Sequence, residues 1–240
     1  MRPVLEIKNL RVKAGDDADA MFTLDVGALA LERGACLAVT GPSGCGKSTL
    51  LEVLAGLRRP ENGAVVTLAH DPDEPPIELQ HVSEAAQLRQ QLIGYVPQSG
   101  GVLPFLTAHE QTMAPLHLAG LSGSDAARTR LGGFADLLDL TDHLEKRRAA
   151  LSGGQRKRVA LMAGLAVRRL LLLADEPTSG LDADNARQVM MALAGVAKTE
   201  GSVVIIATHD VDLARRAEFE IATITDHRLE LETDRESLPA

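Results

Sequence analysis

The stretch that decides the fold is Gly41-Pro42-Ser43-Gly44-Cys45-Gly46-Lys47-Ser48-Thr49, which fits the pattern G-x-x-x-x-G-K-[ST]. An apolar run, Cys36–Thr40, precedes it and is short enough for a strand buried on both faces. Residues 48–57 follow it at helical spacing. Consecutive N–H groups of such a turn can surround an anion, and the N-terminus of the following helix adds positive charge. The sequence therefore predicts a site for the phosphates of a nucleotide.

The side chains at the end of this stretch predict how the phosphates are held. Lys47 is expected to reach the β and γ phosphates, and the Ser48 hydroxyl to bind Mg²⁺. Thr49 is placed to donate to the α phosphate. The remaining contacts are predicted from Gly41, Ser43, Gly44, Cys45 and Gly46. At Cys45 we favour a small filler over a redox switch.

Two carboxylates end a second apolar run, Leu170-Leu171-Leu172-Leu173-Ala174-Asp175-Glu176. In an open α/β sheet, ligands bind at the carboxyl ends of the strands. Asp175 is therefore predicted to hold Mg²⁺, directly or through water, and Glu176 to accept a proton from an attacking water. Without the glycine-rich loop, such a pair would more simply be a helix cap or a solvated turn.

The order of apolar runs predicts an α/β fold. Runs at Ile93–Val96 and Val203–Ala207 join the two above as buried strands, and helical stretches between them indicate a mostly parallel sheet. Alternating residues at 4–7, 10–12 and 22–26 predict an antiparallel hairpin whose loop covers residues 14–20. Residues 116–121, 125–140 and 155–167 look helical, with no buried strand among them.

We expect one domain over residues 1–240. Its core would comprise residues of about 1–98 and 168–229, with an inserted helical subdomain at about 99–167 and a charged tail at about 230–240. The tail is expected to be loosely held.

Composition excludes several classes of protein. The chain has 240 residues, 33 acidic and 25 basic residues and a net charge of −8, which argues against nucleic acid as a partner. Aromatic residues make up 2%, too few for a base-stacking platform that binds single strands. Two cysteines suit a reducing compartment. No apolar run reaches the roughly 18–20 residues of a membrane span, and we expect a cytoplasmic protein.

Further motifs carry a resemblance to a known family. Leu151-Ser152-Gly153-Gly154-Gln155 resembles the signature sequence of the ATP-binding cassette (ABC) ATPases. Gln98 is similar to the Q-loop glutamine of that family, Ser179-Gly180-Leu181-Asp182 to its D-loop, and His209 to its switch histidine. The resemblance runs from about Leu5 to about Leu229, with the motifs in family order. It implies a P-loop NTPase (RecA-like) core with an antiparallel β edge and an inserted α-helical subdomain.

The resemblance also implies a mechanism. Two copies would form a head-to-tail dimer with ATP and Mg²⁺ at each interface, where the signature of one copy caps the γ phosphate held by the other. Glu176 would polarise the water, while Gln98 and His209 position water and phosphate, and Gln98 completes the Mg²⁺ shell. The implied nucleotide contacts of the opposite copy are Ser152, Gly153, Gly154, Gln155 and Asp182.

A membrane partner follows from the same resemblance. The chain looks most like the lipoprotein-release and macrolide-export branch, whose ATPases lie on the cytoplasmic face of the inner membrane and power a permease, here expected on a separate chain. The apolar segment Gly100-Gly101-Val102-Leu103-Pro104-Phe105-Leu106-Thr107 after Gln98 is expected to receive that permease, and its alternative is plain subdomain core. The alternative function is a soluble ABC ATPase of a cytosolic complex, such as iron–sulfur assembly.

The chain departs from the family pattern at one place. The family stacks adenine on an aromatic residue near the end of the first strand, and this place falls on Lys13 or Ala14. Phe22, across the predicted hairpin, or the stem of Lys13 are the candidates to replace it.

A basic run follows the signature sequence. We interpret Arg156-Lys157-Arg158 as a solvated helix face rather than a nucleic-acid patch.

Overall fold

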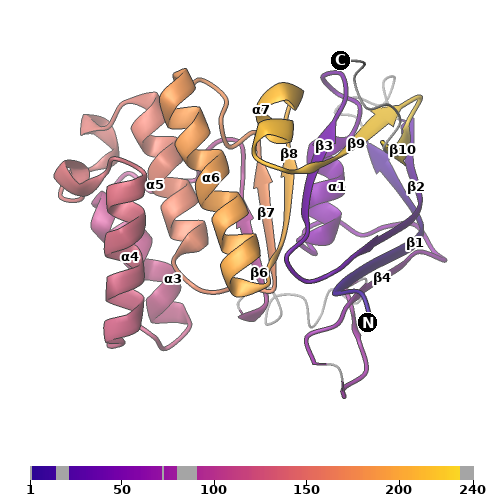
Figure 1. Ribbon diagram of the computed structural model, residues 1–240, viewed down its shortest axis with the longest axis horizontal. Coiled ribbons are helices and arrows are strands. Elements are labelled where there is room, and N and C mark those ends of the chain that lie inside the picture. The colour runs from indigo at the N-terminus through magenta and orange to yellow at the C-terminus, as the bar shows by residue number, and fades with distance from the viewer. Residues whose placement is uncertain (1, 15–21, 72, 80–90, 233–240) are drawn as a thin grey trace, which may run out of the picture.

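Ten strands form a mixed sheet in the order β5-β4-β1-β2-β10-β9-β3-β8-β7-β6 (Figure 1), within the residues that the computed structural model describes, 2–14, 22–71, 73–79 and 91–232. The loop was predicted over residues 14–20, but Ala14 is the last residue of the first strand; residues 15–20 of that loop, and most of the predicted tail, lie outside the described residues. The strands are β1 (Leu5–Ala14), β2 (Phe22–Leu31), β3 (Cys36–Thr40), β4 (Val65–Leu68), β5 (Ile77–Glu78), β6 (Ile93–Val96), β7 (Leu171–Asp175), β8 (Val203–Ala207), β9 (Glu220–Thr225) and β10 (Arg228–Leu231). The helices are α1 (Lys47–Leu54), α3 (Ala108–Leu118), α4 (Asp125–Leu137), α5 (Gly153–Leu165), α6 (Ala183–Glu200) and α7 (Val211–Arg216), with short 3₁₀ turns at Thr141–His143 and Arg148–Ala150.

The parallel half of the sheet is buried on both faces, as its apolar runs predict. Every residue of β3, β7 and β8 is buried. Because side chains alternate along a strand, Leu171 and Leu173 face one apolar cluster around α1, while Leu172 and Ala174 face another beneath α5 and α6. The parallel strands are thus packed between α1 on one face and α5 and α6 on the other, which fixes the positions of their ends.

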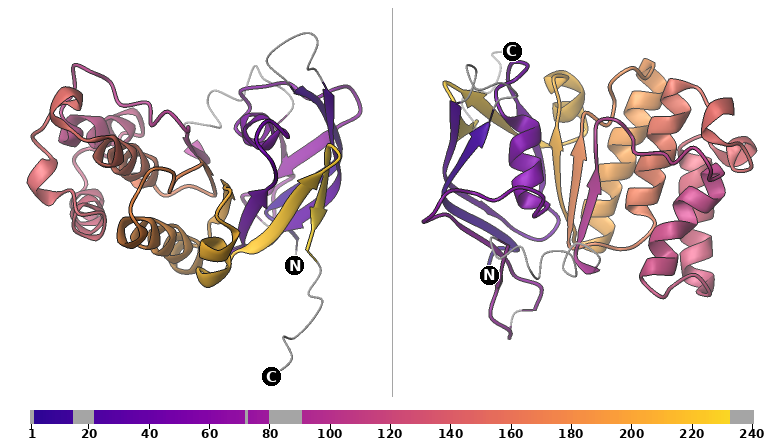
Figure 2. Two further views of the ribbon diagram at one scale, coloured as in Figure 1. Left: turned by 90° about the horizontal axis from the view of Figure 1, so that it is seen from above. Right: turned by 180° about the vertical axis from the view of Figure 1, so that it is seen from behind.

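The predicted antiparallel edge is present. β1 pairs antiparallel with β2 and, on its other side, with β4, and β9 pairs antiparallel with β10. Strands β9, β3, β8, β7 and β6 pair in parallel, as expected. Figure 2 shows the antiparallel strands curving around α1, which therefore lies between them and the parallel strands. Strong sheet twist allows one mixed sheet to enclose a helix in this way.

The helices between β6 and β7 differ from the expectation at one point. Helix α3 begins at Ala108 rather than near residue 116, because Thr107 and Glu110 form a capping box at its start. Thr107 Oγ1 accepts from the Glu110 N–H at 3.1 Å, and the Glu110 carboxylate accepts from the Thr107 N–H at 2.8 Å. Pro115 stands inside the helix.

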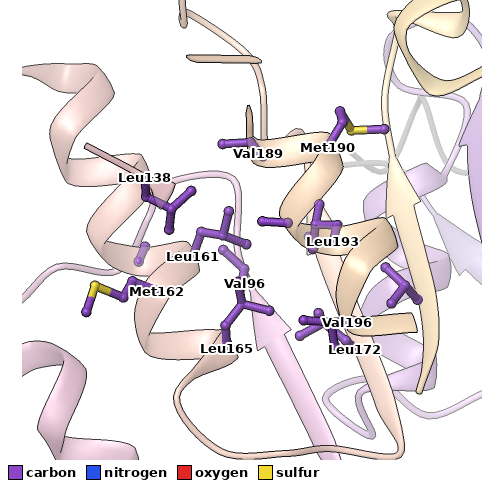
Figure 3. Close-up of a cluster of buried hydrophobic side chains, with 14 of the residues drawn as sticks. Val96, Leu138, Leu161, Met162, Leu165, Leu172, Val189, Met190, Leu193 and Val196 are labelled. Atoms are coloured by element: carbon purple, nitrogen blue, oxygen red, sulfur yellow. The ribbon is translucent and has the colours of Figure 1, made fainter. Parts of the chain in front are cut away.

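The helical region shares an apolar core with the sheet. Figure 3 shows Val96 of β6 among Leu161 and Leu165 of α5 and Leu193 of α6, and all four are buried. Helices α3, α4 and α5 lie together at one end of the molecule (Figure 1). The division into a core and a helical subdomain stays a prediction.

A buried ion pair joins α4 to α6. The Arg130 guanidinium bonds both carboxylate oxygens of Glu200, one at 3.1 Å, and also donates to the Leu165 carbonyl at 2.8 Å. The two side chains are only 15% and 9% exposed. The pair therefore connects the predicted subdomain to the core at the C-terminal end of α5.

Replacement of Glu200 by Ala should lower the free energy of unfolding by about 3–5 kcal/mol, because it leaves the Arg130 charge buried without its partner. Urea denaturation measures this change. Glu218→Ala is the matched control, since Glu218 pairs with Lys198 at the exposed surface, and its effect should be much smaller. Equal effects of the two substitutions would contradict the prediction.

Candidate functional site

The glycine-rich loop lies between β3 and α1, as predicted. Gly41, Gly44 and Gly46 have φ values of 137°, 78° and 109°, in a region that favours glycine. At Gly41 a Cβ would also lie 2.8 Å from the Ile224 carbonyl oxygen and 2.9 Å from Cys45 Sγ. The loop can therefore take its shape only with glycine at these positions. Cys45 is buried beneath it, as expected of a filler.

Lys47 lies over this loop. Its Nζ donates to the carbonyl oxygens of Gly41 and Pro42 at 2.8 and 3.0 Å. The ammonium group thus stands where an anion cradled by the loop would meet it. Ser48 and Thr49 follow in the first turn of α1, half-buried and buried respectively.

Asp175 is the last residue of β7 and is 5% exposed. Its Oδ1 is buried with no hydrogen-bond partner. Burial raises the pKa of the Asp175 carboxyl, a hydrogen bond from Ser48 and the charge of Lys47 oppose the rise, and Glu176 adds to it. A buried carboxylate oxygen without a partner, beside a serine hydroxyl, fits a cation with oxygen ligands.

Glu176 and His209 contact each other directly. The carboxylate Oε2 lies 2.8 Å from His209 Nδ1, although 33 residues separate the two along the chain. Glu176 has a φ of 49°, in the left-handed region, and its N–H bonds the Ala207 carbonyl at 2.9 Å. Because β7 and β8 are adjacent and parallel, the residues after them meet at one edge of the sheet. The Glu176 side chain is 12% exposed and that of His209 70%.

One pocket, with a volume of about 300 Å³, collects most of the predicted residues. Gln98, exposed after β6, reaches it from a third strand. The residues lining it are Ser43, Gly44, Gly46, Lys47, Ser48, Thr49, Gln98, Asp175 and Glu176. Phosphate-binding backbone, a lysine, a hydroxyl and two carboxylates in one pocket suit a metal-bound polyphosphate and an attacking water.

The signature residues lie elsewhere. Ser152 caps α5: its Oγ accepts from the Gln155 N–H at 3.1 Å, and the Gln155 side chain accepts from the Ser152 N–H at 2.9 Å. Ser152 and Gly153 are exposed, and none of the residues 152–155 lines the pocket around Lys47. The exposed N-terminus of α5 is thus a second place suited to an anion, separate from the first.

Asp182 is the N-cap of α6. Its carboxylate accepts from the Asn185 N–H at 3.0 Å and from Asn185 Nδ2 at 2.5 Å, and these hydrogen bonds lower the pKa of Asp182. The D-loop contacts the signature helix, because a Cβ on Gly154 would lie 3.1 Å from Leu181 Cδ2. The two predicted contacts for an opposite nucleotide are therefore adjacent, outside the pocket around Lys47.

Comparison with known proteins agrees with this geometry. A family model described as "ABC transporter" matches residues 24–179. The chain belongs to the ABC transporter family. The cassettes of this family bind and hydrolyse ATP.

Several members of the ABC family are similar over most of the chain. An uncharacterised ABC transporter ATP-binding protein of Mycobacterium tuberculosis is 37% identical over 86% of the chain, which spans 60% of that relative's length. The lipoprotein-releasing system ATP-binding protein LolD of Legionella pneumophila is 38% identical over 78% of the chain and 80% of its own length. A solved dimeric structure of the cassette MJ0796 in a post-hydrolysis state, bound to ADP and Pi, has a TM-score of 0.81 and 27% identity, covering 97% of this chain and 100% of that one.

The ABC motifs did not predict the contacts that the basic residues after the signature sequence make. The expected solvated face at Arg156-Lys157-Arg158 was wrong, because Arg158 is 6% exposed and its guanidinium bonds the Leu138 carbonyl and Asn185 Oδ1, both at 2.7 Å. Lys157 Nζ bonds the carbonyl and hydroxyl of Ser179 in the D-loop. Lys157 thus connects α5 to the segment before α6, and Arg158 connects α5 to the end of α4 and to the first turn of α6. A charge run alone carries no signal for such contacts, since its partners are distant in sequence.

Proposed function

We propose that this chain is the ATP-binding and ATP-hydrolysing subunit of an ABC transporter, powering a separate membrane subunit. The observation that carries the proposal is the single pocket lined by Lys47, Ser48, Asp175 and Glu176. Such a pocket combines phosphate neutralisation with a group that can accept a proton from water. The test is release of phosphate from Mg-ATP by the purified chain, alone and with its membrane partner, and a chain that binds no nucleotide would overturn the proposal.

The residues fit Mg²⁺ and ATP. The unpartnered Asp175 oxygen and the Ser48 hydroxyl would hold Mg²⁺, with Gln98 completing its shell. Among the described residues no group of three His, Cys, Asp or Glu side chains is arranged to hold a metal ion by itself, which suits an ion bound mainly by phosphate and water. Bound Mg²⁺ would neutralise charge on the phosphates. Lys47 and the amides of residues 41–49 would bind the phosphates themselves.

Hydrolysis needs an ordered water and an acceptor for its proton. Glu176, 12% exposed and held by its backbone bond to Ala207, is the acceptor, and it lines the same pocket as Lys47. His209, in contact with Glu176, would position both that carboxylate and the γ phosphate for the reaction. Gln98 would position the water. Each of these residues follows a different parallel strand, so small shifts of the sheet edge would alter all three contacts together.

The active site is completed by a second copy. Ser152, Gly153 and Gly154 stand at an exposed helix N-terminus outside the Lys47 pocket, where they can cap a γ phosphate held by another molecule, with Gln155 and Asp182 beside them. The dimeric structure of MJ0796 with ADP and Pi supports this arrangement. Closure of two copies on ATP and opening after hydrolysis would drive the partner. During this closure and opening, the predicted helical subdomain, residues of about 99–167, would move relative to the core.

The partner is an integral membrane permease on another chain. No helix among the described ranges is both long and apolar enough to cross a membrane. Leu103 and Phe105, which follow Gln98, are 42% and 64% exposed, and unpaired apolar side chains at the surface suit a docking contact. The name of LolD, a lipoprotein-releasing system ATP-binding protein, supports a partner of the lipoprotein-release kind. A place on the cytoplasmic face of the inner membrane is what the family resemblance implies. Nucleic acid is not expected as a partner, given the net charge of −8.

Purification from native membranes distinguishes this function from the soluble alternative. A tagged chain carrying Glu176→Gln should retain a polytopic membrane protein, and Phe105→Ser should reduce that recovery without changing ATP binding. Recovery with soluble proteins only would support a cytosolic assembly ATPase instead. None of the relatives described above is an iron–sulfur assembly protein, so no observation favours that alternative.

A further inference from the structure

Lys157 is a basic residue of α5 to which the proposed reaction assigns no step. It lies about one turn beyond Gly153, where α5 begins, and it is half-buried. Its Nζ donates to both the carbonyl oxygen and the hydroxyl of Ser179, 22 residues further along the chain. A Cβ on the next residue, Gly180, would lie 4.0 Å from the same Nζ. The side chain of Lys157 thus ends on the first two residues of the D-loop.

The contact between Lys157 and Ser179 is specific in its geometry. Immobilising a lysine costs side-chain entropy, and two hydrogen bonds to a single residue offset that cost here. Both acceptors are uncharged oxygens, so the contact depends on where Ser179 lies and not on long-range attraction between opposite charges. Lys157 is therefore suited to fix the position of Ser179 relative to α5.

Ser179 in turn closes the turn that begins at Glu176. The Ser179 N–H donates to the Glu176 carbonyl oxygen at 3.2 Å. Glu176 has a φ of 49°, which costs free energy in a residue other than glycine and persists only where surrounding contacts hold it. The bonds from Lys157 to Ser179 are thus among the contacts that hold Glu176 in this conformation after β7.

The backbone of Lys157 also meets the segment that follows Gln98. A Cβ on Gly100 would lie 3.9 Å from Lys157 Cα and 3.7 Å from the Arg156 carbonyl oxygen. Lys157, Gln98 and Glu176 line one cavity of about 10 Å³. Such a space is about the size of one water molecule, so no larger gap separates the three residues. Lys157 therefore lies where the signature helix meets the segments that carry Gln98 and Glu176.

Lys157 does not itself border the nucleotide pocket. It is not among the residues that line the pocket of about 300 Å³ around Lys47. Gln98 and Glu176 border both that pocket and the small cavity beside Lys157. An effect of Lys157 on hydrolysis would therefore pass through residues that the two spaces share, and Glu176 is the one connected to Lys157 through Ser179.

We infer that Lys157 is a positioning residue for ATP hydrolysis, which bonds Ser179 to the signature helix and so holds the carboxylate of Glu176 where it can accept a proton from water. This inference rests on the proposed ATPase function and adds one residue to it. Lys157 acts on the proton-transfer step and not on nucleotide binding. Its replacement should therefore have a different effect from replacement of Lys47, which meets the phosphates.

The experiment measures turnover and affinity separately in the full-length chain. Lys157→Met keeps the length and the apolar stem of the side chain but removes the ammonium group. It should lower single-turnover hydrolysis of Mg-ATP roughly 10- to 100-fold, because a small misplacement of a reacting group has an effect of that size. The dissociation constant of Mg-ATP, measured by calorimetry, should not change. Lys157→Arg keeps donors for Ser179 and should retain most of the rate.

Lys198→Met is the matched control for Lys157→Met. Lys198 is also a helical lysine bonded to one residue, but its partner is Glu218 at the exposed surface. This variant should change neither turnover nor affinity. A loss of turnover equal to that of Lys157→Met would overturn the inference, because it would show that the loss does not depend on the contact with Ser179.

A double-mutant cycle tests whether Lys157 acts through Glu176. In a Glu176→Gln background, Lys157→Met should not slow the residual hydrolysis further, because no carboxylate is left to position. The same fold-loss in both backgrounds would contradict the inference, since it indicates general damage or a role independent of Glu176.

The remaining outcomes separate this inference from the proposed function. Unchanged hydrolysis in Lys157→Met overturns the inference alone, and so does a loss of Mg-ATP affinity as large as the loss of turnover. Lys157→Ala, which suits a helix interior, serves with the same expectations if the methionine variant does not fold. Failure of the wild-type chain to bind Mg-ATP would instead overturn the proposed function, and the inference with it.

Discussion

Glu176→Gln is expected to lower the rate of ATP hydrolysis roughly 10²- to 10⁴-fold, the contribution of a positioned general base. The amide has nearly the same shape as the carboxylate but cannot accept the proton from water. Its oxygen can still meet His209 Nδ1, now 2.8 Å from the carboxylate, so the arrangement after β7 should persist. ATP binding should be retained, because the phosphates are held by Lys47 and the loop.

Phosphate release under single-turnover conditions measures the loss of rate, and size-exclusion chromatography with Mg-ATP should reveal an accumulated dimer. Glu218→Gln is the matched control, because Glu218 also has a left-handed φ, 61°, but lies at the surface beside Lys198. It should hydrolyse ATP at the rate of the unchanged protein. Normal turnover in Glu176→Gln would reject Glu176 as the base.

Lys47→Ala should weaken Mg-ATP binding at least about 100-fold, since a charge-assisted hydrogen bond to a buried phosphate contributes about 1.5–3 kcal/mol and Lys47 can reach two phosphates. Its Nζ already lies within 2.8 and 3.0 Å of two loop carbonyls, so little reorganisation is needed to meet a phosphate. This change should weaken the binding of Mg-ATP and of inorganic tripolyphosphate alike, because Lys47 meets the phosphates and not the base.

Calorimetry with both ligands checks the second prediction, and Lys198→Ala serves as the control because its ammonium pairs with Glu218 away from the site. Urea denaturation should show that Lys47→Ala remains folded, since the side chain is only half-buried. If a folded Lys47→Ala protein kept its affinity for Mg-ATP, the glycine-rich loop would not be part of the nucleotide site. Loss of ATP binding alone, with tripolyphosphate unaffected, would also contradict the prediction.

Much of the nucleotide site could be predicted because its parts are local in sequence. The glycine pattern before Lys47 requires positive φ values, and Gly41, Gly44 and Gly46 have them. Apolar runs of five residues marked β3 and β8, and both strands have the predicted bounds. Helix α3 was less predictable, because Pro115 obscured a helix whose start is set by a capping box eight residues earlier.

The amino-acid sequence by itself determined the phosphate-binding loop, the two carboxylates after β7 and the order of the family motifs, since each depends on neighbours within a few residues. Only the tertiary structure decided that Glu176 contacts His209, that Arg158 is buried against Asn185, and that Phe22 rather than Lys13 stands beside the loop. These contacts depend on which strands are adjacent and in what register. Long-range pairing arises when the whole sheet closes around α1, and no local pattern encodes it.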